Sequence, residues 1–291
     1  MAPPPPPPPP LPSFDTLSLS RSPVNPHVAI LELNRPKQRN AIDDRMFREI
    51  PLALDFLTKD GVARAVVVRG SGPAFCAGAD LATLAGARTL VSEASYTCQA
   101  RQRLALKELI FTWQAALSAL ELCPLPSVAA VHGACVGAGV DLVTAADIRL
   151  ASGDANFCVK EVDLAITADL GTIQRLPHLV GGSVAADWCL SGKNVSASEA
   201  ASVGLISKTI AASKEELFAE AEKLAGLLAG KSPLALQGVK RALRRARDAP
   251  DAFSGLEAVA DWNAAFLASE DGDEAWGAAV ERRAPRYRSR L

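Results

Sequence analysis

Three acidic residues near the middle of the chain have the surroundings that proton transfer requires. Asp141, Glu161 and Asp169 lie within residues 132–175, on turns between apolar segments and next to small residues. A carboxyl group in apolar surroundings has a raised pKa, so it can act as a general acid or base near neutral pH. Acids also favour turns and helix starts for purely structural reasons, and that reading stays open for each of them taken alone.

The first of these acids follows a glycine-rich turn. Gly133, Gly137 and Gly139 carry no side chain, so a ligand can approach the backbone there closely. If a helix begins near Ala138, its first N–H groups have no partner inside the helix and can bind an oxygen that gains negative charge. This turn is therefore half of a candidate oxyanion hole, and residues 70–81 form a second glycine-rich turn leading into a helix.

The elements that must position these groups alternate along the chain. The patterns predict strands at 27–33, 65–69, 127–131, 148–151 and 157–159, and helices at 40–59 and 100–122. Strand, turn and helix in alternation indicate an α/β domain with mostly parallel strand pairing. Residues 213–283 are predicted to form three or four helices, which we interpret as a helical C-terminal subdomain.

Composition excludes several classes of protein. The 31 basic and 32 acidic residues among 291 give a net charge of -1, so nucleic acid is not an expected partner. The six cysteines form no C-x-x-C pair, which argues against a zinc site or a disulfide framework, and we predict no metal. The longest apolar run, at 123–140, is interrupted by prolines and glycines, so no membrane span is expected.

Both ends of the chain carry recognisable segments. Residues 3–10 are consecutive prolines, and we predict a disordered proline-rich tail over 1–22, with a polyproline ligand for another domain as the alternative. Ser289, Arg290 and Leu291 resemble the C-terminal tripeptide read by the peroxisomal import receptor, which predicts that receptor as a partner and the peroxisome as the location.

Several motifs in a fixed order resemble the signatures of the crotonase (enoyl-CoA hydratase/isomerase) superfamily. They occupy residues 33–36 with 40–41, 75–81, 132–142 and 171–177. The resemblance implies a spiral of ββα units over 23–210 and a helical oligomerisation part over 211–288 that builds a homotrimer or homohexamer. It also implies an acyl-CoA thioester substrate, with CoA as part of the substrate and no separate cofactor.

The resemblance assigns roles residue by residue. The two backbone N–H donors for the thioester oxygen fall on Ala79 and Ala138, where the superfamily more often has glycine at the second position. The acids match most closely the Δ3,5-Δ2,4-dienoyl-CoA isomerase branch, with Glu161 as the base at C2, Asp169 as the acid near C6 and Asp141 tuning the pair. The substrate contacts implied by the same motifs are Gly78, Ala79, Asp80, Leu81, Ala82 and Gly139.

Other readings compete with this one. An enoyl-CoA hydratase would use two acids to activate water, and a non-catalytic acyl-CoA binder would need none of them. Asp80 is also explained by turn bonding, His132 by a structural role and Cys76 by packing. The basic run 240–247 either meets the CoA phosphates or forms a solvated helix face.

Overall fold

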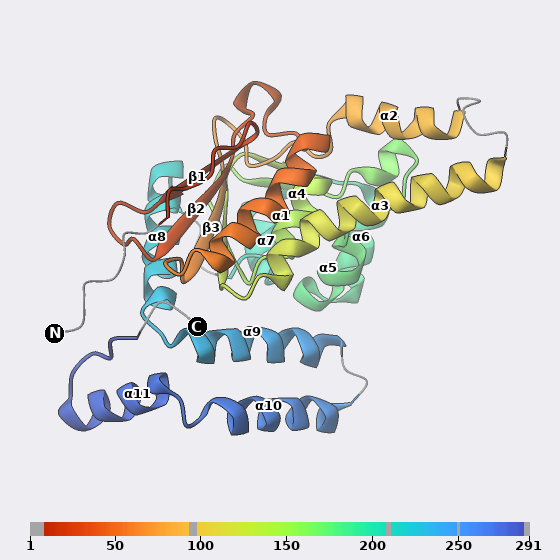
Figure 1. The fold of residues 1–291 in the computed structure, drawn as a ribbon. Coiled ribbons are helices and arrows are strands. Elements are labelled where there is room, and N and C mark those ends of the chain that lie inside the picture. The colour runs from red at the N-terminus through yellow and green to blue at the C-terminus, as the bar shows by residue number, and fades with distance from the viewer. Residues whose placement is uncertain (1–8, 93–97, 208–210, 249–250, 288–291) are drawn as a thin grey trace.

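The computed structural model describes residues 9–92, 98–207, 211–248 and 251–287 (Figure 1). Its main sheet has five strands in the order β1-β2-β3-β4-β6. The strands β2 (Val28–Leu33), β3 (Ala65–Gly70), β4 (Ser127–Val131) and β6 (Ile148–Ala151) run parallel, and β1 (Leu17–Arg21) pairs antiparallel with β2. The predicted strands at these positions and the mostly parallel pairing are confirmed.

Alternate residues of the parallel strands enter two different cores. In β3, Val66 and Val68 face the larger core, whereas Ala65 and Val67 face the smaller one. The helices α1 (Asp44–Lys59) and α3 (Gln99–Leu122) contribute to the larger core, and α8 (Lys214–Ala229) covers the other face of the sheet (Figure 1). Strands covered on both faces need apolar residues at every position, which explains the continuous apolar runs in the sequence.

The predicted disordered tail over 1–22 extends too far. Residues 1–8 lie outside the described part, but Leu17–Arg21 forms β1, and the side chain of Leu17 is buried. The carboxylate of Glu49 in α1 accepts hydrogen bonds from the N–H of Thr16 at 2.9 Å and of Asp15 at 3.1 Å. The alternation of leucine and serine in this segment is the period of a half-buried edge strand, and the carboxylate secures its start.

A smaller, three-stranded sheet lies beside the first. It contains β5 (Ala134–Val136), β7 (Asn156–Cys158) and β8 (Val195–Ser196) in the order β5-β7-β8. The remaining short elements are η1 (Pro36–Gln38), α2 (Leu81–Ser92), α4 (Ala138–Thr144), η2 (Glu161–Leu164), α5 (Thr172–Val180), α6 (Gly182–Ser191) and α7 (Ala197–Ser202). Only the β7 position was predicted as a strand, because two- and three-residue strands show no measurable period.

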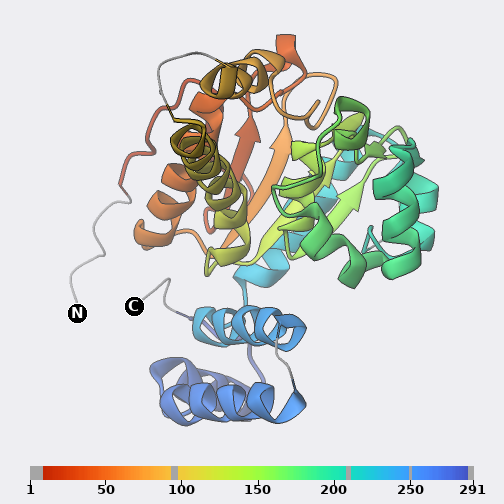
Figure 2. The ribbon, with the colours of Figure 1, turned by 90° about the vertical axis from the view of Figure 1, so that its right-hand side faces the viewer.

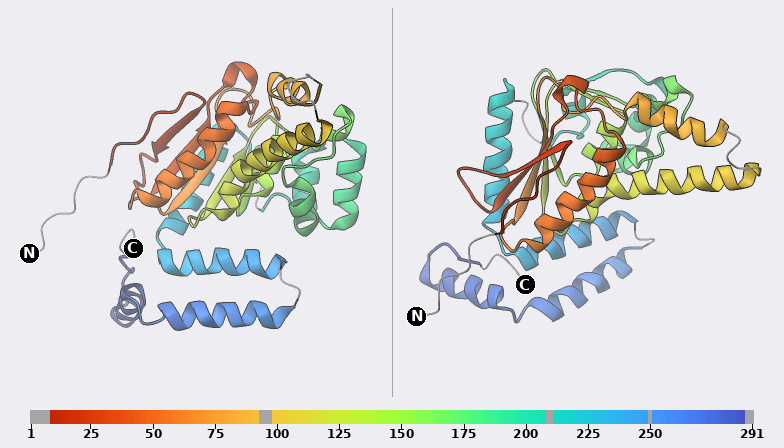
Figure 3. Two further views of the ribbon diagram at one scale, coloured as in Figure 1. Left: turned by 45° about the vertical axis from the view of Figure 1, so that its right-hand side comes forward. Right: turned by 45° about the horizontal axis from the view of Figure 1, so that its top comes forward.

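The predicted helical subdomain over 211–288 divides in two. Its first helix, α8, packs Leu217, Ala221 and Ala225 against the main sheet and is part of the body. The other three, α9 (Pro233–Asp248), α10 (Ala252–Phe266) and α11 (Glu270–Glu281), form a C-terminal arm below the body (Figures 1, 2 and 3). The boundary predicted at 211 is therefore one helix too early.

Two basic side chains tie α9 to the body. The ammonium of Lys240 lies 2.8 Å from the Asp147 carboxylate and donates to the carbonyls of Leu120 and Leu125 at 3.1 and 3.0 Å. The guanidinium of Arg247 pairs with Glu121 near the end of α3. Of the two alternatives for this run, a solvated face is thus wrong for these two residues, because carboxylates and carbonyls at and after the C-terminal end of α3 bind them.

Candidate active site

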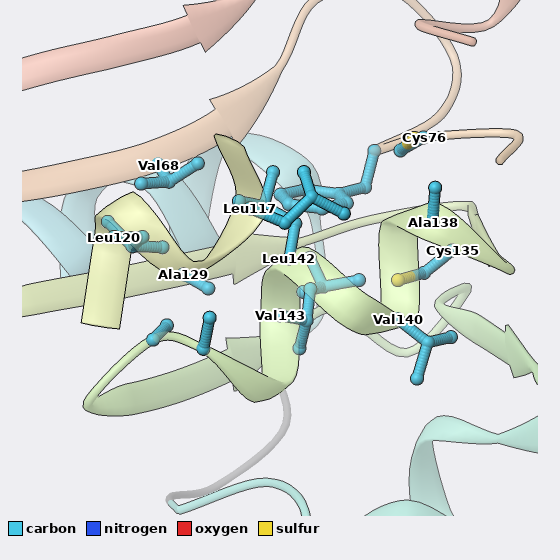
Figure 4. Close-up of a cluster of buried hydrophobic side chains, with 14 of the residues drawn as sticks. Val68, Cys76, Leu117, Leu120, Ala129, Cys135, Ala138, Val140, Leu142 and Val143 are labelled. Atoms are coloured by element: carbon cyan, nitrogen blue, oxygen red, sulfur yellow. The ribbon is translucent and has the colours of Figure 1, made fainter. Parts of the chain in front are cut away.

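A parallel bridge between Cys76 and Cys135 brings the two glycine-rich turns together. The Cys76 N–H donates to the Ala134 carbonyl at 3.0 Å, and the Val136 N–H donates to the Cys76 carbonyl at 2.9 Å. Ala79 and Ala138 each stand three residues beyond the bridged cysteines, so both turns leave the bridge in the same direction. Figure 4 shows Cys76, Cys135 and Ala138 in one buried cluster.

Glycine precedes each candidate donor for a steric reason. Gly78 has φ +103° and Gly137 has φ +50°, values that residues with a side chain rarely adopt. A Cβ on Gly78 would lie 3.2 Å from the Val136 carbonyl oxygen, so glycine allows the turns to touch.

The amides after these glycines are available to a ligand. Ala138 is the first residue of α4, as predicted, and its N–H has no acceptor one turn earlier in the helix. Ile42 pairs with the residues on either side of Ala79, through Gly78 and Asp80, which leaves the Ala79 N–H without a partner in the described chain. The two amides are therefore candidate donors to one oxygen.

Both turns open into a cavity of about 940 Å³. Glu161 and Asp169 line it together with Ala79 and Ala138. The rest of the wall is mostly apolar and comes from α2, α3 and the segment after η2: Leu81, Leu84, Ala87, Leu106, Ile110, Trp113, Leu164, Ile166 and Leu170. A largely apolar cavity with a few charged groups, among them Arg88 and Lys160, suits a ligand with a hydrocarbon chain and a polar reacting group.

Glu161 begins η2, three residues after the end of the strand β7, and its carboxyl group faces the second turn. Its Oε1 lies 3.1 Å from the position that a Cβ on Gly137 would occupy, and its Oε2 is buried without a hydrogen-bond partner. Burial, followed by the repulsion of Asp141 and Asp169, raises the pKa of Glu161 to about 7. A carboxyl with this pKa can give or take a proton at neutral pH.

Asp169 reaches the same cavity from the loop that leads into α5. Its main-chain carbonyl accepts a hydrogen bond of 2.6 Å from the side-chain amide of Gln114 in α3, which fixes the loop. Its side chain is half-buried, and this burial raises the pKa of Asp169. Two carboxyl groups with raised pKa values therefore face one cavity.

Asp141 lies outside the cavity lining, within α4, and is fully buried. Its Oδ1 accepts a hydrogen bond of 2.6 Å from the Thr172 N–H, while its Oδ2 has no partner. Burial raises the pKa of Asp141 to about 6, and Thr172 and Arg175 oppose that rise. Asp141 therefore stands close enough to oppose the ionisation of Glu161 by its charge, and its tuning role stays a prediction.

Comparisons with known proteins place this geometry in a family. Residues 24–290 match the model of the enoyl-CoA hydratase/isomerase family. The chain belongs to this family. Its fold is similar to that of an enoyl-CoA hydratase from Bacillus anthracis, with a TM-score of 0.83 and 28% identity over 94% of this chain and 100% of the other. The crotonase-type fold predicted from the motifs is thus confirmed.

Curated relatives in the family have more specific names. A peroxisomal Δ3,5-Δ2,4-dienoyl-CoA isomerase from Arabidopsis thaliana is 42% identical over 94% of this chain and 98% of its own length. A mitochondrial enzyme of the same name from Homo sapiens is 39% identical over 87% of this chain and 76% of its own. The resemblance to this branch of the family is therefore confirmed as well.

Two of the six residues predicted to contact substrate do not line the cavity. Gly139 packs against Cys76, where an added Cβ would lie 2.9 Å from the Cys76 Cβ, so its role is helix packing. Ala82 is exposed, and its N–H donates to Asp80 at 2.9 Å. Gly78, Ala79, Asp80 and Leu81 do line the cavity.

Structural contacts support the structural alternative for three residues with competing roles, although Asp80 also lines the cavity. The carboxylate of Asp80 is bound by Arg35 at 3.0 Å and by the Ala82 N–H. His132 is buried, bonds the Gly72 carbonyl at 3.0 Å and lies outside the cavity lining. Burial raises the pKa of the Cys76 thiol to about 12, so this thiol is not a nucleophile at neutral pH.

The apolar wall of the cavity was not predicted. Trp113 is one example: its ring stacks on Phe47 at 5.2 Å between ring centroids, and it also lines the cavity. The pattern of α3 shows that it is amphipathic but not that one turn of it faces a ligand rather than the core. Among the described residues, no cluster of three His, Cys, Asp or Glu side chains could hold a metal ion, and no helix is long and apolar enough to cross a membrane.

Proposed function

We propose that this protein isomerises 3,5-dienoyl-CoA to 2,4-dienoyl-CoA. One observation carries the proposal: two carboxyl groups with raised pKa values, Glu161 and Asp169, share one cavity with two free backbone amides. Relatives that align over most of the chain and bear the isomerase name support it.

The two amides would act on the thioester oxygen. Moving both double bonds toward the thioester passes through a dienolate, whose negative charge spreads onto this oxygen. Ala79 and Ala138 stand on turns that are bridged to each other, and both residues line the same cavity. Each donor of this kind is typically worth about 3 to 4 kcal/mol of transition-state stabilisation.

The two acids would move the protons. Glu161 removes a proton from C2, and Asp169 donates one at C6, so the substrate neither gains nor loses atoms overall. After one turnover Glu161 holds the extra proton and Asp169 lacks one, so the pair must exchange a proton before the next. No metal or separate cofactor is needed for this exchange, and a pKa of about 7 makes both states of Glu161 accessible.

Hydration is the second candidate, because the solved relatives of similar fold carry the name enoyl-CoA hydratase. A hydratase needs two acids that reach one water molecule in the cavity. Here the Asp141 carboxyl is fully buried beneath the cavity and bound to the Thr172 N–H. This arrangement favours isomerisation by Glu161 and Asp169 over hydration by Glu161 and Asp141.

One assay distinguishes the candidates. Purified protein is given a 3,5-dienoyl-CoA and, separately, a 2-enoyl-CoA, and the ultraviolet bands of the conjugated product and of the substrate are followed. We expect isomerisation of the 3,5-dienoyl-CoA. If the protein only adds water to the 2-enoyl-CoA, it is a hydratase. If it binds both compounds but converts neither, it is a non-catalytic binder.

A variant tests the second acid. Asp169→Asn should abolish isomerisation but keep acyl-CoA binding within about tenfold, because it removes a titrating group and little volume. Asp163→Asn is the matched control, since this acid stands on η2 and is 47% exposed, paired with Lys160. Near-normal turnover of Asp169→Asn would remove Asp169 from the mechanism.

We also propose that several copies of the chain assemble, as a homotrimer or homohexamer. The C-terminal arm supports this assembly, because large apolar side chains such as Leu243, Phe253 and Trp276 are between 68% and 82% exposed. Sedimentation or light scattering would measure the mass, and a monomer at micromolar concentration would contradict the proposal.

Peroxisomal import through Ser289, Arg290 and Leu291 is a further proposal. This tripeptide lies outside the described residues, and the relatives are named peroxisomal in one organism and mitochondrial in others. Cells expressing the chain with a fluorescent protein at its N-terminus should show peroxisomal spots that disappear when the three residues are deleted. Mitochondrial fluorescence would contradict the proposal.

A further inference from the structure

A buried arginine stands behind the acids and has no role so far. Arg175 belongs to α5, and its side chain is only 7% exposed. Its Nε donates to the Glu121 carboxylate at 3.0 Å and its Nη2 to the Ser118 hydroxyl at 2.7 Å, both on α3. Its Nη1 is buried and has no hydrogen-bond partner in the described chain.

The unpaired nitrogen lies against the turn that begins α5. A Cβ on Gly171 would come within 1.9 Å of the Arg175 Nη1, so the guanidinium occupies the space beside the backbone of Gly171. The Arg175 N–H also donates to the Gly171 carbonyl at 3.1 Å. The main chain of Arg175 is therefore hydrogen-bonded to the turn, and its side chain packs beside it.

The next residue of this turn binds the buried acid. The N–H of Thr172 donates a hydrogen bond of 2.6 Å to the Asp141 carboxylate. Asp141 in turn repels the negative charge of Glu161 at the cavity. Arg175 can thus influence the pKa of Glu161 indirectly, through the Gly171–Thr172 turn and the buried carboxylate of Asp141.

We propose that Arg175 is a positioning residue for this site: it holds the Gly171–Thr172 turn so that Asp141 stays oriented and ionised, and Asp141 then sets the base strength of Glu161. The inference rests on the proposed isomerase function. Arginine suits the role because its planar fork binds α3 through two nitrogens while the third faces the turn.

Other titratable groups also surround the two acids. They are Asp169 before α5, Cys76 and Cys135 at the bridge, Cys158 of β7, Lys160 before η2 and Cys189 of α6. Burial raises the pKa of all four thiols, so these are neutral at pH 7 and change little between pH 5 and 8. Asp169 is the remaining acid, and it is unchanged in the variants below.

Two variants should move the pH profile in opposite directions. Arg175→Gln removes the cation, so the pKa of Asp141 rises and less of its carboxylate is ionised. Asp141 then repels the Glu161 carboxylate less, so the pKa of Glu161 falls. The acidic limb of kcat/KM should therefore shift down by about 0.5 to 1 pH unit. Glu121→Gln removes the anion that neutralises Arg175, so the same limb shifts up. A residue that only supported the fold would not produce shifts of opposite sign.

Rate and control measurements complete the test. Arg175→Gln should lower kcat by about 10- to 100-fold and change KM by less than about threefold, because the substrate contacts remain. Arg175→Lys should restore the position of the limb, since it keeps the charge, but not the full kcat. Arg247→Gln is the matched control: it removes the other partner of Glu121, on α9, and should leave the limb within about 0.2 unit.

The outcomes separate this inference from the proposed function. If the wild-type protein does not isomerise a 3,5-dienoyl-CoA, the function itself is wrong. If the wild type is active but both variants keep its pH limb, only the role of Arg175 is overturned. Should Arg175→Gln fail to fold, the upward shift in Glu121→Gln decides, because that variant retains the arginine.

Discussion

Asp141, Glu161 and the two bridged glycine turns are here called the floor of the cavity. Apolar side chains are usually buried and charged ones exposed, and the floor and the C-terminal arm depart from this pattern in opposite ways. The floor buries ionisable groups, with Asp141 fully enclosed and one oxygen of Glu161 unpartnered. The arm exposes apolar ones: α9 and α10 have no buried residue among those described, and Trp276 of α11 is 72% exposed. Burying charge destabilises the fold and exposing apolar surface invites association, so each region has a function that the isolated fold does not explain.

The two regions also differ in how far the chain itself encloses them. The floor is closed by its own chain, through the Cys76–Cys135 bridge, the helix α4 and the bond from Thr172 to Asp141. The arm contacts the body mainly through Lys240 and Arg247 on one face of α9. We therefore expect substitutions in the floor to affect chemistry within one subunit, and substitutions in the arm to affect assembly.

The largest effect is expected at Glu161. Glu161→Gln removes the group that takes the proton from C2 but keeps its size, so kcat should fall by about 1000-fold or more. Isomerisation is followed by absorbance, and binding of the acyl-CoA by calorimetry. Asp163→Asn on the same 3-10 helix is the control and should retain wild-type kcat; a similar kcat for Glu161→Gln would show that the floor is not the chemical site.

Gly137→Ala should come next. Its Cβ would meet Glu161 at 3.1 Å in a conformation with φ +50°, so the turn must shift and move the Ala138 N–H. We expect a loss of about 100-fold in kcat/KM, the usual effect of losing one oxyanion donor. Gly181→Ala separates strain from chemistry, because that glycine also has positive φ but nothing within 4 Å of an added Cβ; it should lower only the melting temperature.

The third prediction concerns the loss of folding stability caused by the buried carboxyl group of Glu161. Since the pKa of Glu161 is raised to about 7 in the folded chain, the unfolded chain ionises first as pH rises from 4.5, and the free energy of unfolding falls until about pH 7. Glu161→Gln should therefore be more stable than wild type by about 3 kcal/mol at pH 8 and equal to it at pH 4. Urea unfolding at both pH values measures this, and a difference independent of pH would contradict it.

The smallest effect on chemistry is expected in the arm. Leu243→Asp places a charge on an exposed apolar position of α9, which should weaken assembly by at least tenfold in the dissociation constant. Light scattering across a dilution series measures the mass. Leu52→Asp, at a similarly exposed leucine of α1, is the control; equal masses for both variants would mean that the arm is not the assembly surface.

Sequence patterns predicted the long elements and the chemistry better than the short elements and the wall of the cavity. The strands at 127–131 and 148–151 were predicted with their observed bounds, because short, mostly apolar runs bounded by turns have few alternatives. The strand Leu17–Arg21 was absorbed into the proline tail, since five residues of alternating leucine and serine give a weak signal beside a strong composition bias. Gly139 was assigned to substrate and packs on Cys76, because a glycine pattern does not say which neighbour needs the space.

The sequence by itself determined the family, the three acids and the two glycine turns, because these depend on residue types in a fixed order. Only the tertiary structure decided where they lie relative to one another. It placed Glu161 and Asp169 on the cavity and Asp141 outside its lining, bound to the turn that Arg175 packs against. The physical reason is that electrostatic coupling depends on burial and on distances across the fold, which residue order along the chain does not specify.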